Sequence, residues 1–194
     1  MQTLSLENAV ILDTETTGLD DKAQIVEISA ICAVTGSVLF NSLVRPSSWI
    51  PSEATAIHGI TNSDVSRSPS FVDVILPLFS ALSDRDFVIY NNDFDTRLFI
   101  QSYELNKQIT SKSLRLSYQA LKQKFIDSRC AMRWYAEFYG QLDDCRDGYR
   151  WQSLVNACNQ QNIDVSDLNA HRALADCEMT RRLIHAVNAK IEAR

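Results

Sequence analysis

The sequence predicts an α/β or α+β domain with a mixed sheet, because apolar runs of strand length come first and alternate later with runs at helical spacing. The chain has 194 residues, of which 45% are hydrophobic, enough for one domain with a real core. Residues 8–14 are expected to form a short buried strand. Two further apolar runs, 24–34 and 37–44, are separated by Thr35-Gly36 and predict a hairpin. With the first strand they predict a three-stranded meander.

The later elements follow from apolar spacing and from turn residues. Residues 45–61 should be a loop with a short helical turn, and Pro69 should open a helix that contains Pro77. The remaining expected elements are a strand at 86–91, a helix at 93–103, a strand at 125–129, a helix at 131–140, a helix at 151–161 and a last helix from about Arg172. The predicted order is therefore β-β-β-α-β-α-β, followed by helices to the end of the chain.

The charge of the chain leaves open whether it binds nucleic acid. The net charge of −5 does not by itself indicate a nucleic-acid binder. Residues 101–135, however, carry seven basic and only two acidic side chains. This segment could follow a phosphate backbone, or it could be a solvated helical surface, and charge alone does not decide between the two.

The cysteines and the N-terminus predict a cytoplasmic protein. The five cysteines are widely scattered and include no CxxC pair, which favours reduced thiols over a disulfide framework or a zinc site. The first residues lack the basic region of a signal peptide. No apolar run approaches the roughly 18 residues that a membrane span needs, so a membrane partner is not expected.

The first strand ends in two carboxylates, in the stretch VILDTETTG. Because strand side chains alternate, Asp13 and Glu15 share one face while Thr14 takes the other. Two hard oxygen donors on one face are a natural site for Mg²⁺ or Mn²⁺. The alternative is a strand end that has simply reached solvent.

Two more aspartates are candidates. Asp95 is expected in the first turn of the helix that follows the apolar strand at 86–91, where the helix dipole alone would favour an acid. On the last helix, Asp176 lies within about 40° of Thr180, Leu183 and Val187 at 100° per residue. It should therefore point inward, and an inward acid needs a partner such as a metal ion shared with Asp13.

One histidine and one phenylalanine complete the candidates. Five residues separate His171 from Asp176, a net rotation of about 140° on a helix, so His171 is expected on the loop or at the helix start. It could be a general base or an ordinary exposed histidine. Phe94 could be part of the core or one wall of a base-binding pocket.

Three stretches resemble a known family. VILDTETTGLD, IYNNDFDTRLF and HRALADCEMT resemble the three motifs of the DEDDh 3′→5′ exonucleases, the family of the DNA polymerase III epsilon subunit and ribonuclease T. The match runs from about residue 8 to 190, and AIHGIT resembles the family's substrate-contacting segment. The last motif has His five residues before Asp, as in this branch, whereas the sister branch has Tyr four residues before Asp.

The resemblance implies a single exonuclease domain over residues 1–194 with a ribonuclease-H-like α/β fold, a five-stranded mixed sheet flanked by α-helices. It implies that two Mg²⁺ or Mn²⁺ ions are held by Asp13, Glu15, Asp95 and Asp176. His171 would be the general base of a two-metal-ion mechanism. The products would be nucleoside 5′-monophosphates released from a 3′ end.

The resemblance also implies a set of substrate contacts, formed by Thr16, Thr17, Gly18, Ile57, His58, Asn91 and Phe94. Ile57 and Phe94 would flank the terminal nucleotide, and His58 would touch its sugar or phosphate. Many members have His where this chain has Tyr90, which should keep a hydrogen bond and bulk without loss of activity.

The expected function is hydrolysis of single-stranded DNA from its 3′ end, because a paired base would have to unstack to reach Phe94. The alternatives are a 3′→5′ exoribonuclease and a domain that binds nucleic-acid ends without cutting. A purely structural protein would leave the inward Asp176 unexplained. The sequence ends soon after the last helix, so tethering to a polymerase is not expected, whereas a homodimer stays open because some relatives are dimers.

Overall fold

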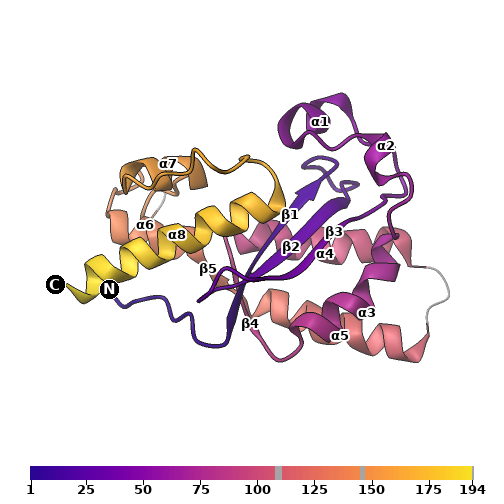
Figure 1. Ribbon diagram of the computed structural model, residues 1–194, viewed down its shortest axis with the longest axis horizontal. Coiled ribbons are helices and arrows are strands. Elements are labelled where there is room, and N and C mark those ends of the chain that lie inside the picture. The colour runs from indigo at the N-terminus through magenta and orange to yellow at the C-terminus, as the bar shows by residue number, and fades with distance from the viewer. Residues whose placement is uncertain (108–110, 145–146, 194) are drawn as a thin grey trace.

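The computed structural model describes residues 1–107, 111–144 and 147–193, and its centre is a five-stranded mixed sheet with helices on both faces (Figure 1). The strands are β1 (Ala9–Thr16), β2 (Ile25–Cys32), β3 (Val38–Leu43), β4 (Asp86–Ile89) and β5 (Arg129–Cys130). Their order in the sheet is β3-β2-β1-β4-β5. The first three strands are antiparallel, whereas β4 runs parallel to both β1 and β5. The predicted meander and mixed sheet are confirmed.

Six of the eight helices in the described part of the chain cover the two faces of the sheet (Figure 1). They are α1 (Ser52–His58), α2 (Asn62–Val65), α3 (Phe71–Leu82), α4 (Asn92–Asn106), α5 (Lys112–Ile126), α6 (Ala131–Tyr139), α7 (Leu154–Gln160) and α8 (Ala173–Glu192). One face is covered by α3, α4 and α5, and the other by α6, α7 and α8. Pro77 lies inside α3 without ending it, and α6 ends at Gly140, whose φ of 76° favours glycine.

The alternation along β1 decides where the site can form. Val10 and Leu12 belong to the core under α3, α4 and α5, whereas Ile11 belongs to the core under α8. Continuing this alternation, Asp13 lies on the α8 side and Thr14 on the α4 side. The end of β1 can therefore be reached by side chains from two different layers.

The expected strand at 125–129 is wrong in most of its length. Helix α5 runs through Ile126, and only Arg129–Cys130 pairs with β4. The cause is packing, because Phe125 is buried and stacks on Phe99 with ring centroids 4.2 Å apart. Helix α5 itself was not among the predicted elements. The sequence QLDDCRDG at 141–148 also predicts a turn-rich loop, and residues 145–146 of it lie outside the described residues.

Two of the basic side chains in the segment 101–135 serve the fold. Lys124 donates to the Arg85 carbonyl at 2.7 Å, and Arg129 donates to the Ser5 carbonyl at 2.5 Å. Part of the positive charge is thus used within the fold. Among the residues that the structure describes, no helix has both the length and the apolar character needed to cross a membrane.

Candidate active site

Three carboxylates meet where β1 ends. Asp13 and Glu15 come from β1, and Asp176 comes from the first turn of α8. Each offers an oxygen, and these oxygens lie within 4.8 Å of one another. Asp176 therefore points toward the sheet, as its position on the helix predicted. Three converging carboxylates are a donor set that could hold a hard divalent cation.

Asp95 lies beside this group of three and outside it. It is buried in the first turn of α4, and its Oδ1 accepts a hydrogen bond from Thr14 Oγ1 at 2.7 Å. Thr14 thus fixes the Asp95 carboxylate from the opposite face of β1. The negative charge of Asp95 still acts on Asp13, whose pKa it raises. All four predicted acids therefore lie near the end of β1, and three of them have oxygens within 4.8 Å of one another.

The pKa values of the four predicted acids are all raised, mainly by burial. Burial raises the pKa of Asp13 well above its usual range, and the charges of Asp95 and Asp176 raise it further. Burial also raises the pKa of Glu15 to about 8 and that of Asp95 to about 7. The pKa of Asp176 is raised by burial too, against a hydrogen bond from a backbone N–H. A bound cation would favour the charged form of every one of these groups.

These shifts predict that the metal-free protein loses stability between about pH 6.5 and 8. Unfolded carboxyl groups have lost their protons by pH 6.5, whereas folded Glu15 and Asp95 still hold theirs in part. The folded state binds more protons, so stability falls as pH rises. The slope is at most about 1.4 kcal/mol per pH unit for each extra proton.

Thermal melting in a chelator at several pH values measures this slope. Burial lowers the pKa of His58, so below the pKa of an unfolded histidine the unfolded state binds more protons at this group and stability rises with pH. The series should therefore start at pH 6.5, where this opposite effect is fading. Excess Mg²⁺ should flatten the dependence, since ligand carboxylates are then ionised at every pH. A metal-free melting temperature that rises over this range would contradict the assigned shifts.

His171 directly precedes α8, where the sequence placed it. Its side chain is exposed, and its backbone has a φ of 63°, in the left-handed region. Its backbone N–H donates to Asp176 Oδ1 at 3.2 Å. This hydrogen bond and the charge of His171 both lower the pKa of Asp176. The imidazole is therefore next to the acidic group, on its solvent side.

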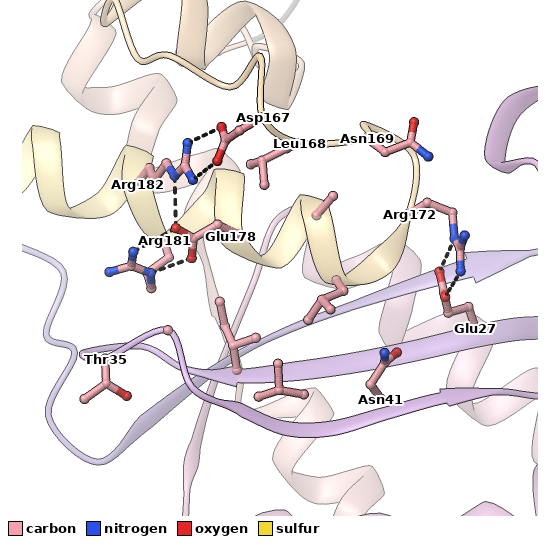
Figure 2. A pocket seen from close by; sticks show the side chains of 15 residues that line it. Glu27, Thr35, Asn41, Asp167, Leu168, Asn169, Arg172, Glu178, Arg181 and Arg182 are labelled. Carbon is pink, nitrogen blue, oxygen red and sulfur yellow. Dashed lines mark hydrogen bonds and ion pairs between the residues drawn. The ribbon is translucent and has the colours of Figure 1, made fainter.

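An ion pair with a buried acid fixes the start of α8, and sequence reasoning missed it. Arg172 donates to both carboxylate oxygens of Glu27, at 3.0 and 2.5 Å (Figure 2). The Ala173 N–H adds a third bond to Glu27 at 3.0 Å. Glu27 is buried on β2, directly opposite Glu15 in the sheet. A signal was present, because an acid within the apolar run 24–34 requires a partner.

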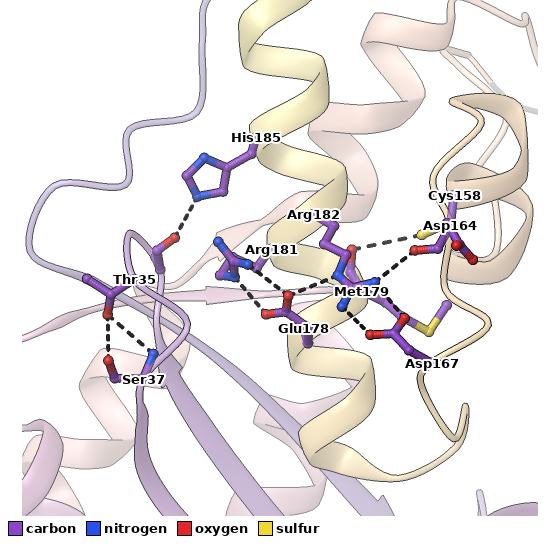
Figure 3. A network of polar contacts seen from close by, with 11 residues as sticks. Thr35, Ser37, Cys158, Asp164, Asp167, Glu178, Met179, Arg181, Arg182 and His185 are labelled. Atoms are coloured by element: carbon purple, nitrogen blue, oxygen red, sulfur yellow. Dashed lines mark hydrogen bonds and ion pairs between the residues drawn. The ribbon is translucent and has the colours of Figure 1, made fainter.

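The loop before His171 is held by a second network, centred on Arg182 of α8 (Figure 3). Arg182 donates to both carboxylate oxygens of Asp167 at 2.8 and 2.7 Å and to the Asp164 carbonyl at 2.8 Å. It also bonds Glu178 at 2.9 Å. The segment that carries His171 is thus fixed at both ends, by this network and by the Arg172 pair.

A cavity of about 510 Å³ opens next to Glu15. Six of the predicted substrate contacts line it, namely Thr16, Thr17, Gly18, Ile57, His58 and Phe94. Asn91 is not a lining residue and lies at the N-terminus of α4 with a φ of 70°. The preceding Tyr90 is buried, and its hydroxyl donates to the Gln152 carbonyl at 2.9 Å, so it keeps the expected hydrogen bond and bulk.

Both ring nitrogens of His58 are engaged inside the protein. The Ile60 N–H donates to Nδ1 at 3.0 Å, so Nε2 carries the proton and donates to the Thr16 carbonyl at 3.2 Å. Burial lowers the pKa of His58, which favours this neutral form. His58 therefore supports the backbone wall of the cavity. Its contact with a sugar or phosphate stays a prediction.

Arg97 contacts three residues that line the cavity, namely Phe94, Leu19 and Asp20. Its guanidinium carbon lies 5.3 Å from the centroid of the Phe94 ring. The same side chain donates to the Leu19 and Asp20 carbonyls, both at 3.1 Å. Arg97 thus connects α4, which carries Asp95, to the loop that follows β1. Sequence reasoning did not single out Arg97, because its partners are backbone atoms far away in the chain.

The mixed sheet, with an acidic cluster at the end of its first strand and a cavity beside it, agrees with a nuclease of the ribonuclease-H-like class. Residues 10–184 match the model of the exonuclease family RNase_T. The chain belongs to this family, and it is a hydrolase of phosphodiester bonds. The predicted resemblance to the DEDDh exonucleases is confirmed.

Relatives and solved structures agree with this assignment. The chain is 42% identical over 183 residues to a protein of Escherichia phage 186 named uncharacterized exonuclease CP81, covering 93% of this chain and 88% of that protein. It is 34% identical to the DNA polymerase III subunit epsilon of Rickettsia felis, covering 88% and 69%. A structure of exonuclease X with 5′ overhanging duplex DNA aligns with a TM-score of 0.63 and 26% identity, covering 93% and 92%. The nuclease domain of 3′hExo, a DEDDh family member bound to rAMP, aligns with a TM-score of 0.67 at 16% identity, covering 95% and 92%, and supports the fold alone.

Proposed function

We propose that this protein is a metal-dependent 3′→5′ exonuclease that releases nucleoside 5′-monophosphates from the 3′ end of single-stranded DNA. The observation that carries the proposal is the convergence of Asp13, Glu15 and Asp176, with oxygens within 4.8 Å, beside a cavity of about 510 Å³. Cavities of this size hold ligands of nucleotide dimensions.

The residues fit a pair of divalent cations. Asp13, Glu15, Asp95 and Asp176 would hold two Mg²⁺ or Mn²⁺ ions, because hard oxygen donors suit these cations and four carboxylates balance four positive charges. Burial is the main cause of the raised pKa values of the four groups, and neighbouring acids add to it for Asp13 and Glu15, so a bound cation would offset the cost of ionising them. When bound, such ions supply Lewis-acid stabilisation of charge on the phosphoryl and leaving oxygens.

The protein groups would do the remaining work. His171 accepts the proton of a water whose oxygen forms a bond to the phosphorus. The bond from phosphorus to the O3′ of the preceding nucleotide breaks, so the released nucleotide keeps its 5′-phosphate. Thr16, Thr17 and Gly18 hold the 3′ end, and Ile57 and Phe94 flank its base.

The choice of single-stranded DNA has separate support. Phe94 lies on the wall of the cavity, and a base in a duplex would have to unstack to reach it. The epsilon subunit and exonuclease X relatives favour DNA. A 3′→5′ exoribonuclease is the second candidate, because discrimination between DNA and RNA depends on contacts to the 2′-OH.

Oligonucleotides labelled at the 3′ end test the proposal. With Mg²⁺ or Mn²⁺ the first product should be a labelled 5′-monophosphate, and a chelator should abolish its release. Initial rates should be highest on single-stranded DNA, lower on the matched RNA and lowest on the blunt duplex. Faster cleavage of RNA would establish the exoribonuclease, and faster cleavage of the duplex would refute the single-strand preference. Binding of the oligonucleotide without any release would indicate a domain that only holds ends.

A further inference from the structure

Three exposed large apolar side chains of the described residues belong to the cavity wall or to the segment that leads into it. Trp49 is 80% exposed and Leu19 is 78% exposed, the two highest values among them, and Ile57 is 60% exposed. Leu19 and Ile57 line the cavity beside Glu15. Single exposed apolar residues are ordinary, but a group of them usually marks a binding surface.

Trp49 lies two residues before the cavity wall in the chain. Pro51 lines the cavity, and consecutive Cα atoms are 3.8 Å apart, so the Cα atoms of Trp49 and Pro51 are separated by at most about 7.6 Å. The Trp49 side chain is not among the lining residues and is exposed. Its backbone is thus close enough for the indole ring to meet a group that extends out of the cavity.

The backbone before Trp49 is fixed to the cavity wall. The Ser47 N–H and Oγ donate to Gln24 Oε1 at 2.9 and 3.0 Å, and Gln24 Nε2 donates to Ser48 Oγ at 3.0 Å. The Gln24 backbone in turn exchanges hydrogen bonds with Thr17, at 2.8 and 2.9 Å. Thr17 lines the cavity, so Gln24 connects the segment before Trp49 to the cavity wall.

The backbone after Trp49 is fixed as well. Ile50 is buried, and its N–H and carbonyl are both bonded to the Asn62 side chain, at 2.8 and 3.0 Å. Hydrogen bonds on both sides thus fix the backbone that carries a large, exposed aromatic side chain. An exposed aromatic ring on an ordered segment is what stacking on nucleobases requires.

We propose that Trp49 stacks on a nucleobase of the substrate that lies outside the cavity, next to the terminal nucleotide. The inference rests on the proposed function, because it takes the cavity as the site of that terminal nucleotide. Its role is to bind the strand, and it takes no part in the chemistry. Stacking accepts every base, so Trp49 would add affinity for single strands with little preference for sequence.

A nucleobase fits this position better than a partner protein does. The apolar surface continues from the cavity mouth through Leu19 and Ile57. On the other side Trp49 is preceded by the exposed, polar Ser47 and Ser48. Leu19 and Ile57, two exposed apolar side chains near Trp49, are thus cavity-lining residues, which favours an occupant that also enters the cavity.

Substitution of Trp49 tests the inference. For a single-stranded decamer we expect Trp49→Ala to raise KM by about 5- to 150-fold, the range for loss of one base–aromatic stack, with kcat changed less than about twofold. Trp49→Phe should recover most of the affinity. The p-nitrophenyl ester of thymidine 5′-monophosphate has no second base. The ratio of kcat/KM for the decamer to kcat/KM for this ester should therefore fall by the same factor. Leu116→Ala on α5, a side chain that is 61% exposed, is the matched control.

A binding measurement separates this inference from the proposed function. The Kd of a fluorescein-labelled decamer, measured by anisotropy in a chelator, should rise by a similar factor in Trp49→Ala. An unchanged Kd overturns the inference, whatever the activity. A native protein that cleaves neither substrate refutes the proposed function instead. A change in sedimentation of Trp49→Ala at unchanged Kd would make Trp49 a contact between copies and also overturn the inference.

Discussion

Asp13→Asn is expected to lower the metal-dependent nuclease activity by about three powers of ten or more, since metal ions contribute several kcal/mol of charge stabilisation in such reactions. Asp13 has the most central position of the four acids, because Asp95, Asp176 and Glu15 all act on its pKa. Asparagine keeps the shape of the side chain and removes its negative charge. Calorimetric titration with Mn²⁺ should show weaker binding in parallel with the lost activity.

The same substitution should not harm the metal-free fold. In the native chain, burial and neighbouring acids disfavour the charged form of Asp13. A neutral amide removes that repulsion, so in a chelator at pH 8 the melting temperature of Asp13→Asn should equal or exceed that of the native protein. Loss of activity by unfolding would give the opposite result, and the two explanations are therefore separable.

Glu7→Gln is the control for Asp13→Asn. It removes one negative charge from an exposed acid close to the N-terminus. Its activity, Mn²⁺ affinity and stability should all match those of the native chain. If Asp13→Asn retained more than about a tenth of the native activity, a loss of under about 1.4 kcal/mol, Asp13 could not be a required metal ligand.

The sheet was predictable because its signals are local. Runs of apolar residues gave the strands, and the Thr35-Gly36 turn gave the hairpin. The inward direction of Asp176 followed from the geometry of a single helix. In each case the information lies within one element or between neighbouring elements, where periodicity and turn chemistry are sufficient.

Long-range partners were not predictable in the same way. Arg172 and Glu27 are 145 residues apart, and Thr14 and Asp95 are 81 apart. Which buried acid receives a guanidinium and which receives a hydroxyl depends on the layers that α8 and α4 occupy. The missed helix α5 is a different case, because its buried Tyr118, Leu121 and Phe125 recur at helical spacing, so its signal is local and was overlooked.

The cavity combines both kinds of information. The motif stretches predicted six of its lining residues, although they come from three separate segments. Arg97, which links two of those segments through the Leu19 and Asp20 carbonyls, carries no mark in the sequence. Family resemblance therefore named the groups at the site, and the structure was needed to show what holds them in place.

His171→Asn should reduce kcat by about 10²- to 10⁴-fold, the usual contribution of a general base. Asparagine is the better substitution here because it tolerates the left-handed backbone that His171 adopts, with φ of 63°. The backbone N–H that donates to Asp176 at 3.2 Å is kept as well. The variant thus removes the imidazole with little effect on the acidic group.

The measurements that accompany this variant separate a base from a ligand. Mn²⁺ affinity and the KM for a single-stranded oligonucleotide should stay within about threefold of the native values, because a loss confined to kcat is the sign of a group that acts only in the transition state. His171→Ala should show the same kinetic loss, with a somewhat lower melting temperature from the strained backbone. If Mn²⁺ binding weakened along with the rate, His171 would be holding the metal site together and another group would have to accept the proton. Because the imidazole is exposed next to Asp176, we expect the loss in kcat alone.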